Sequence, residues 1–169
     1  MVEYKYKTFW PRFWAGLIDG LIFMPMALFS DWLFGLELNG VVNFIYYALV
    51  HTLSYYFYSV YMHGKFGQTI GKMLLKIKVS KVGGEPFTYK RALYRDSVII
   101  GASIIILFIE AGPILNGINP FLAAEGSQAF QVLIWIQIAW FMMEFITMLT
   151  NNKRRAVHDF IAGSVVTRL

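Results

Sequence analysis

Four apolar stretches, each long enough to cross a bilayer, constrain the fold of this chain more than any other feature. A spanning helix needs about 20 predominantly apolar residues. Of the 169 residues 57% are apolar and only 15% are charged, and the four stretches have almost no polar face for water to solvate. We therefore expect an all-α membrane protein built as a four-helix transmembrane bundle, with helices near residues 12–34, 41–62, 92–110 and 128–150.

The distribution of positive charge predicts the orientation of this bundle. All 15 Lys and Arg residues lie in the N-terminal arm with the start of the first stretch, in the loop 63–91 with the start of the third stretch, and in the tail 151–169. The turn near 35–40 and the loop 111–127 carry none. By the positive-inside rule both termini and the central loop are cytoplasmic. The net charge of +5 is thus a topology signal, and we expect no nucleic-acid partner because no aromatic–basic recognition motif stands out.

The central loop carries a strand pattern. Apolar and polar residues alternate from Met73 to Lys81, and the turn signal Gly83-Gly84 follows. The segment 164–168 is also strand-like, and a lone strand leaves its backbone unpaired. We expect these segments to find partners, each other among the options, in a small cytoplasmic β element of a single domain, 1–169. Asn119-Pro120 further suggests a short helix over 120–125.

Asp19 is the first candidate for a functional group, because an ionisable residue inside a bilayer is costly and usually faces protein or a wet cavity. Arg12 lies seven residues before it, on the same helix face and about 10 Å away along the axis. Gly16 and Gly20 form a GxxxG pattern that lets a neighbouring helix approach closely. Arg12 and Asp19 have two interpretations that stay open: an ion or proton site, or a structural pair.

Glu144 provides a second carboxylate in the fourth stretch, on a polar stripe with Gln137 and Asn151. Counting residues places Asp19 and Glu144 at a similar depth, on the order of 10 Å from the cytoplasmic boundary. Two such carboxylates could bind a cation or share a proton. The alternative is that Glu144 pairs with a basic residue such as Arg12 or Arg95.

His51 falls near the middle of the second stretch, where an imidazole could relay protons. The alternative, a neutral hydrogen-bonding histidine, is the commoner case. No catalytic motif is present, so we expect neither an enzyme nor a cofactor. The chain has no cysteine and no cluster with metal-ligand spacing, so we expect no metal site.

Three segments, PRFWAGLIDG, GQTIGKMLLKIKV followed by RALYRD, and RRAVHDFIAGSVV, together resemble the RDD family of bacterial membrane proteins. That family is named for an arginine and two aspartates, which match Arg12, Asp19 and Asp159. The resemblance also covers motif residues in the loop and tail: Gly67, Gln68, Thr69, Gly71, Lys72, His158 and Gly163. It implies a compact multi-pass protein of the bacterial cytoplasmic membrane, with exchange of monovalent cations for protons proposed for some members.

Two functions follow from these observations. The first is a transport-related protein that exchanges Na⁺, K⁺ or Li⁺ for protons, with Asp19 as the shared binding group, Arg12 tuning its pKa and Glu144 or Asp159 assisting. Four helices are few for a transporter, and a homodimer would supply a second set. The second is a non-transporting protein that docks on another membrane protein or on anionic lipid headgroups. The loop and tail motifs would then cap the bundle, with Asp159 or the Lys72 region contacting Arg12 or Arg95.

Overall fold

The computed structural model describes residues 3–36, 38–120 and 127–169 and is mainly helical. The expected helix at 120–125 lies almost wholly outside the described residues. In chain order the elements are η1 (Tyr4–Tyr6), α1 (Phe9–Phe34), α2 (Gly40–Tyr46), the π-helical η2 (Tyr47–Leu53), α3 (Ser54–Phe66), α4 (Ile70–Leu74), β1 (Ile77–Lys81), α5 (Tyr89–Leu115), α7 (Gln128–Thr150), α8 (Val157–Ala162) and β2 (Ser164–Arg168).

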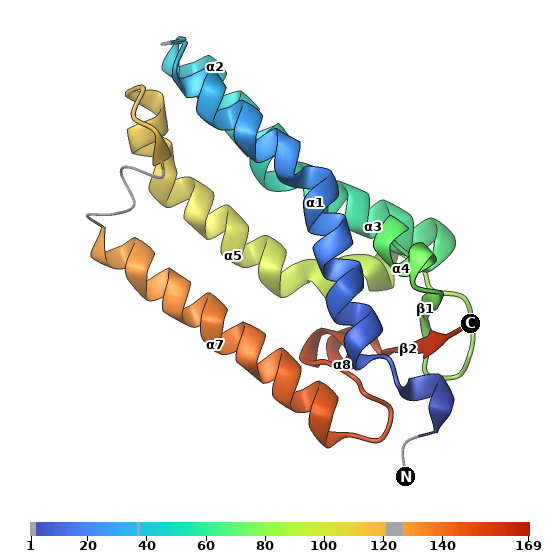
Figure 1. The fold of residues 1–169 in the computed structure, drawn as a ribbon. Helices are drawn as coiled ribbons and strands as arrows, with labels where there is room; N and C mark the ends of the chain where they lie inside the picture. The colour runs from blue at the N-terminus through green and yellow to red at the C-terminus, as the bar shows by residue number, and fades with distance from the viewer. Residues whose placement is uncertain (1–2, 37, 121–126) are drawn as a thin grey trace.

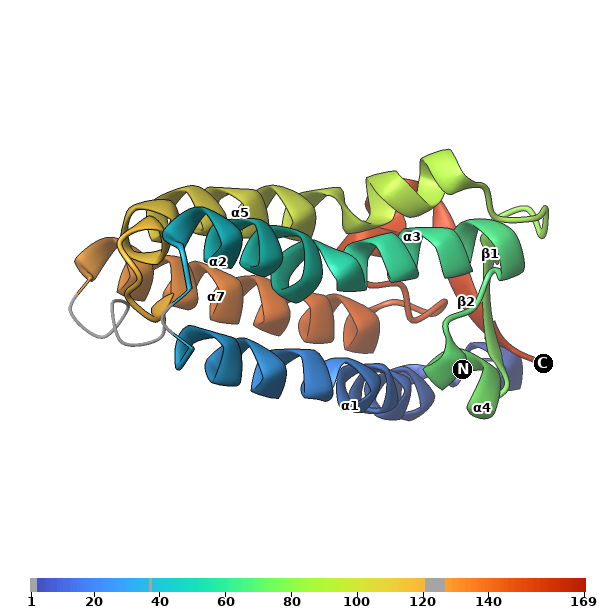
Figure 2. The same ribbon diagram turned by 90° about the horizontal axis from the view of Figure 1, so that it is seen from above.

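The long helices run side by side, and the short elements gather at one end of them (Figure 1). We call this end, with α4, α8, β1 and β2, the sheet end. The start of α2 and the end of α5 lie at the opposite end (Figure 1). Seen from above, α1 runs along one side and α2, α3 and α5 run along the other (Figure 2). Residues distant in sequence therefore meet at the sheet end.

Three regions of the described chain are long and apolar enough to cross a membrane: Tyr4–Phe34, Tyr89–Leu115 and Gln128–Thr150. The first, third and fourth predicted stretches thus form long apolar helices. The second stretch is helical throughout 40–66, but a π-helical segment divides it, and Asn43, His51 and several tyrosines make it more polar. The fourth spanning helix, and with it the four-helix transmembrane bundle, stays a prediction.

The two strand-like segments pair with each other, as the alternating pattern allowed. Strands β1 and β2 form a two-stranded antiparallel sheet in which Val79 is opposite Val166. Ile77, Val79 and Val166 are fully buried and pack in one cluster with Ala15 of α1 and Ala92 of α5. The first strand begins at Ile77 because residues 70–74 form α4. This cluster fixes the sheet against the helices.

The expected close approach at the GxxxG pattern is wrong within the described chain. A Cβ atom added at Gly16 or Gly20 would meet nothing within 4 Å. The close approach to α1 is made instead by Gly71 of α4, where an added Cβ would lie 2.2 Å from the carbonyl oxygen of Ala15. A backbone contact this tight excludes any side chain, so Gly71 lets α4 lie directly on α1.

Candidate functional site

Arg12, near the start of α1, forms a buried ion pair with Asp159 of α8. Its Nη2 atom donates to Asp159 Oδ2 at 2.6 Å, and the two side chains are 8% and 0% exposed. Asp159 Oδ1 accepts from Arg95 Nε of α5 at 3.2 Å. Two neutral donors complete its environment, the Ala156 backbone N–H at 3.1 Å and the Ser164 hydroxyl at 3.0 Å. Asp159 thus joins α1, α5 and the tail segment through four hydrogen bonds.

Arg95 spreads its guanidinium over three partners. Besides Asp159, its Nη1 atom lies 3.1 Å from His63 Nε2 and its Nη2 atom lies 2.7 Å from His158 Nε2. Because guanidinium groups only donate hydrogen bonds, both histidines accept through Nε2. His63 Nδ1 then donates to the Ser59 carbonyl at 2.8 Å. His63 was not selected from the sequence, because it sits in no motif and Arg95 is distant from it in sequence.

Glu144 of α7 pairs with His158, at 2.8 Å between Oε2 and Nδ1. Its other oxygen accepts the His158 backbone N–H at 3.2 Å. The predicted basic partner of Glu144 is therefore His158, and within the described chain neither Arg12 nor Arg95 pairs with it directly. Glu144 connects to Arg95 through His158. We refer to Arg12, His63, Arg95, Glu144, His158 and Asp159 as the charge network.

Asp19 is 2% exposed and does not pair with Arg12. Its Oδ1 atom accepts from the Tyr58 hydroxyl at 2.8 Å and from the Gly71 backbone N–H at 2.9 Å. The Tyr58 hydroxyl in turn accepts the Ile70 N–H at 2.7 Å. The first N–H groups of a helix have no partner within the helix, and here Asp19 and Tyr58 satisfy two of them. Asp19 therefore holds α4 against α1.

The remaining motif residues around α4 also have structural roles. Gly67 ends α3 in the left-handed conformation, with φ of 71°. The Gln68 side chain donates to the Ile77 carbonyl at 2.9 Å, and Thr69 caps the start of α4. In the tail, Gly163 ends α8 with φ of 61°, and an added Cβ would lie 2.6 Å from Arg91 Nη1. The motif thus builds the sheet end around the charge network.

Lys72 extends the charge network without an acidic hydrogen-bond partner. Its Nζ atom lies 2.8 Å from His63 Nε2, the atom that also faces Arg95. Burial, followed by the charge of Arg95, lowers the pKa of Lys72 from 10.5 to about 7, against the opposing influence of Asp19 and Asp96. Lys72 therefore changes its charge near neutral pH.

Asp159 behaves in the opposite way. Burial alone would raise its pKa, but Arg12, His158 and Arg95 together hold it well below its ordinary value of 3.8. Burial lowers the pKa of His158, and the charge of Arg95 adds to this effect. At neutral pH the network therefore contains an ionised Asp159 between two arginines, and a neutral His158.

A cavity of about 420 Å³ opens beside the network, between α1, α5 and α7. Its polar lining consists of Arg12, Asp19, Tyr55, Lys72, Arg95, Trp140, Glu144 and His158, and the rest is mostly apolar. Asp19 and Glu144 thus line one cavity, and their common depth in the membrane stays a prediction. Three of the lining side chains are basic, a feature that the sequence did not reveal.

His51 lies apart from the charge network. Its Nδ1 atom lies 3.0 Å from the Ser30 hydroxyl, and its ring stacks on Tyr47 with centroids 4.5 Å apart. It lines a second cavity, of about 300 Å³, together with Glu110 of α5. Glu110 is 7% exposed and was not selected from the sequence, where it falls at the end of the third stretch. Tyr55 lines both cavities, and a proton relay through His51 stays a prediction.

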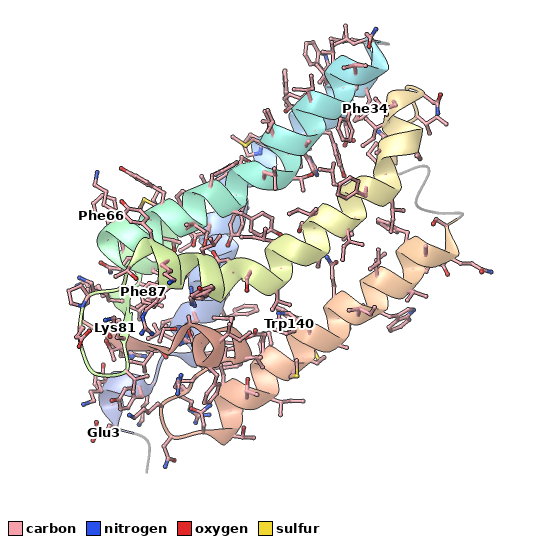
Figure 3. The ribbon with its side chains drawn as sticks, turned by 180° about the vertical axis from the view of Figure 1, so that it is seen from behind. Glu3, Phe34, Phe66, Lys81, Phe87 and Trp140 are labelled. Atoms are coloured by element: carbon pink, nitrogen blue, oxygen red, sulfur yellow. The ribbon has the colours of Figure 1, made fainter. Side chains whose placement is uncertain are left out.

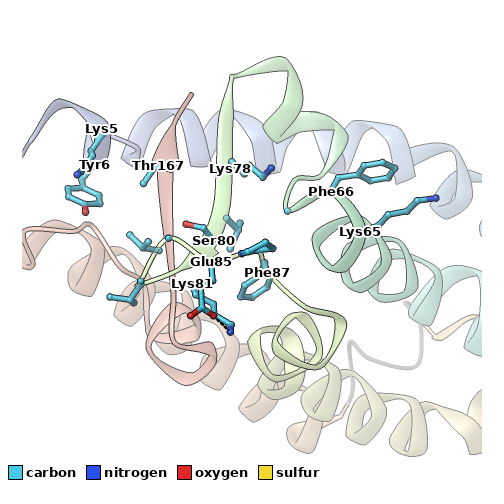
Figure 4. A pocket seen from close by; sticks show the side chains of 17 residues that line it. Lys5, Tyr6, Lys65, Phe66, Lys78, Ser80, Lys81, Glu85, Phe87 and Thr167 are labelled. Carbon is cyan, nitrogen blue, oxygen red and sulfur yellow. Dashed lines mark hydrogen bonds and ion pairs between the residues drawn. The ribbon is translucent and has the colours of Figure 1, made fainter.

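An exposed groove of about 580 Å³ lies beside the sheet. Figure 4 shows four lysines around it, Lys5, Lys65, Lys78 and Lys81, with Lys81 paired to Glu85. We call this the basic groove. It differs from the cavity between α1, α5 and α7 in having its charged groups on the surface, where water screens them.

Comparison with known proteins agrees with the motifs. The sequence model of the RDD family matches residues 6–163, a range that includes Arg12, Asp19 and Asp159. An uncharacterized membrane protein of Bacillus subtilis (strain 168), YteJ, is 29% identical over 132 residues, which cover 73% of this chain and 80% of that protein. No solved structure gives a significant match.

Proposed function

This chain belongs to the RDD family of membrane proteins, and we propose that it binds anionic lipid rather than exchanging cations. The observation that carries the proposal is the cavity between α1, α5 and α7, whose wall bears Arg12, Lys72 and Arg95. Basic side chains at a membrane-embedded surface favour anionic headgroups. This is the non-transporting function that the sequence suggested as an alternative.

The acidic groups leave little room for a transported cation. Asp159 already accepts from two guanidinium groups, and Glu144 is paired with His158. Asp19 has one oxygen held by Tyr58 and Gly71. At Asp159 a Na⁺ or K⁺ ion would have to displace these donors. At Asp19 and Glu144 it would compete with the basic side chains of Arg12, Lys72 and Arg95 in the same wall. Exchange of Na⁺, K⁺ or Li⁺ for protons stays a prediction, and this arrangement disfavours it.

The surface of the sheet end supports the same proposal. The basic groove lies there (Figure 4), on the side that the positive-inside rule assigns to the cytoplasm. Each well-placed Lys or Arg near an anionic leaflet contributes about 1 kcal/mol of attraction. We propose a bacterial inner-membrane protein with both termini cytoplasmic, without enzymatic activity. A homodimer stays a prediction.

The test is a thermal unfolding measurement in lipid nanodiscs. The protein would be compared in phosphatidylcholine alone and with added phosphatidylglycerol. We expect a higher midpoint with the anionic lipid, because a ligand that binds the folded state raises its stability. Equal midpoints would contradict anionic-lipid binding. In parallel, proteoliposomes with an internal pH dye would receive Na⁺, K⁺ or Li⁺, and we expect no proton movement.

A further inference from the structure

The cavity between α1, α5 and α7 contains two buried hydrogen-bond donors without an acceptor. Glu144 Oε2 of the same wall accepts no hydrogen bond among the described residues, although it lies 2.8 Å from His158 Nδ1. The two donors, Arg12 Nε and Trp140 Nε1, have no hydrogen-bond partner among the described residues. Both side chains line the cavity, and Figure 3 marks Trp140 on α7. Buried polar groups are normally satisfied, and an exception calls for an explanation such as an absent ligand.

Both unsatisfied atoms need a hydrogen-bond acceptor. An indole N–H and a guanidinium N–H are donors only, so each needs an acceptor oxygen. The other two nitrogens of the Arg12 guanidinium already have partners, since Nη2 binds Asp159 and Nη1 contacts the sulfur of Met148. Its Nε atom is therefore the part of the guanidinium left for a ligand. Lys72 and Arg95 lie in the same wall as the carboxylates of Asp19 and Glu144, so an oxyanion fits at the Arg12 and Trp140 donors and not across the whole polar lining.

The rest of the cavity wall is suited to hydrocarbon. It is formed by apolar side chains of α1, α5 and α7: Phe9, Phe13, Leu17, Ile99, Phe141 and Phe145. A small hydrophilic anion would leave this surface uncovered, whereas an acyl chain would cover it. The polar and apolar parts of one cavity thus describe an amphiphile.

We infer that this cavity holds the oxyanion of one acyl-chain lipid, with lipid oxygens accepting from Arg12 Nε and from Trp140 Nε1 and the chain against the α1–α7 wall. The oxyanion is a carboxylate or a phosphodiester, from a fatty acid or a phospholipid. The inference rests on the proposed function and adds its site and stoichiometry: one lipid for each chain, selected by hydrogen bonding as well as by charge.

The test uses two matched Trp→Phe variants on the same helix. Trp140→Phe removes the indole donor from the cavity, whereas Trp135→Phe removes a side chain that is 69% exposed and does not line it. Binding of oleate, phosphatidylglycerol, phosphatidylcholine and inorganic phosphate to the detergent-solubilised protein would be titrated by native mass spectrometry. Arg12→Lys, which keeps the charge but removes the Nε donor, is a further variant.

We expect one oleate or phosphatidylglycerol per chain at saturation, and the stronger of the two identifies the oxyanion. Loss of one hydrogen bond to a charged group should weaken this binding about tenfold in Trp140→Phe and leave Trp135→Phe unchanged. Arg12→Lys should also weaken it, if its unfolding midpoint shows that it folds.

Other results would overturn the inference. Equal affinities of Trp140→Phe and Trp135→Phe, with anionic lipid still preferred, would refute this site and leave the proposed function standing. If phosphatidylcholine bound to every variant as tightly as phosphatidylglycerol does, both this site and the proposed function would be refuted. Binding of inorganic phosphate as tight as that of the lipids would refute the inference that the ligand needs an acyl chain.

Discussion

Substitution of Asp159 by Asn tests whether the charge network holds the sheet end to the helices. Asn has nearly the same size but removes the charge that faces Arg12 and Arg95. Each hydrogen bond to a charged group contributes about 1.5–3 kcal/mol, so two of them amount to about 3–6 kcal/mol. Breaking one partner of a buried ion pair typically costs about 3–5 kcal/mol. We therefore expect Asp159→Asn to lower the free energy of unfolding by about 3–5 kcal/mol.

The measurement is an SDS titration in mixed micelles, followed by tryptophan fluorescence. Glu3→Gln is the control, because Glu3 also pairs with a basic residue, Lys5 at 3.1 Å, but the two side chains are 66% and 55% exposed. Exposed pairs contribute little, so this variant should unfold like the wild type. If Asp159→Asn were no less stable than Glu3→Gln, the network would not be what holds the sheet end in place.

Three other predictions follow from the structure. Gly71→Ala should destabilise the fold by about 1–3 kcal/mol, because the added Cβ would strike the backbone of α1. Gly20→Ala is the control and should be neutral or stabilising. The same SDS titration compares the two variants. The folded-state pKa of Lys72, about 7, lies below its ordinary 10.5, so the unfolded chain binds more protons between these values and stability should rise with pH across this window. Lys72→Met should flatten that rise in thermal unfolding measured from pH 6 to 9. Because the chain has no cysteine, single cysteines at Gly83 and Asn116 can report orientation: an impermeant thiol reagent applied to intact cells should label only the second, and labelling of Gly83 would contradict the cytoplasmic placement.

Sequence patterns predicted the features that depend on neighbouring residues. Long apolar runs gave the helices α1, α5 and α7, and alternation in the segment around Ile77 and Val79 gave β1. Pairing of β1 with β2 was predictable because both strands were short and otherwise unpaired. The division of residues 40–66 by a π-helical segment was not, since helix type depends on packing as well as periodicity.

The sequence identified most residues of the candidate site but few of the contacts between them. Arg12, Asp19, Glu144 and Asp159 were all selected as polar residues in apolar or motif segments. Helix spacing placed Arg12 and Asp19 on one face, but the structure pairs Arg12 with Asp159 from the other end of the chain. The loop and tail motifs had suggested that contact as part of the second function. His63 went unnoticed for the same reason: its contacts with Lys72 and Arg95 exist only after α3, α4 and α5 have packed.

The most direct test of the account is an experimental structure of the protein in nanodiscs that contain phosphatidylglycerol, at a resolution that shows ordered lipid and ions. The account predicts an oxyanion within hydrogen-bond distance of Arg12 Nε and Trp140 Nε1, with Asp159 still bound to Arg12 and Arg95. A monovalent cation coordinated by Asp19 in that cavity, with no anion beside Arg12, would contradict it.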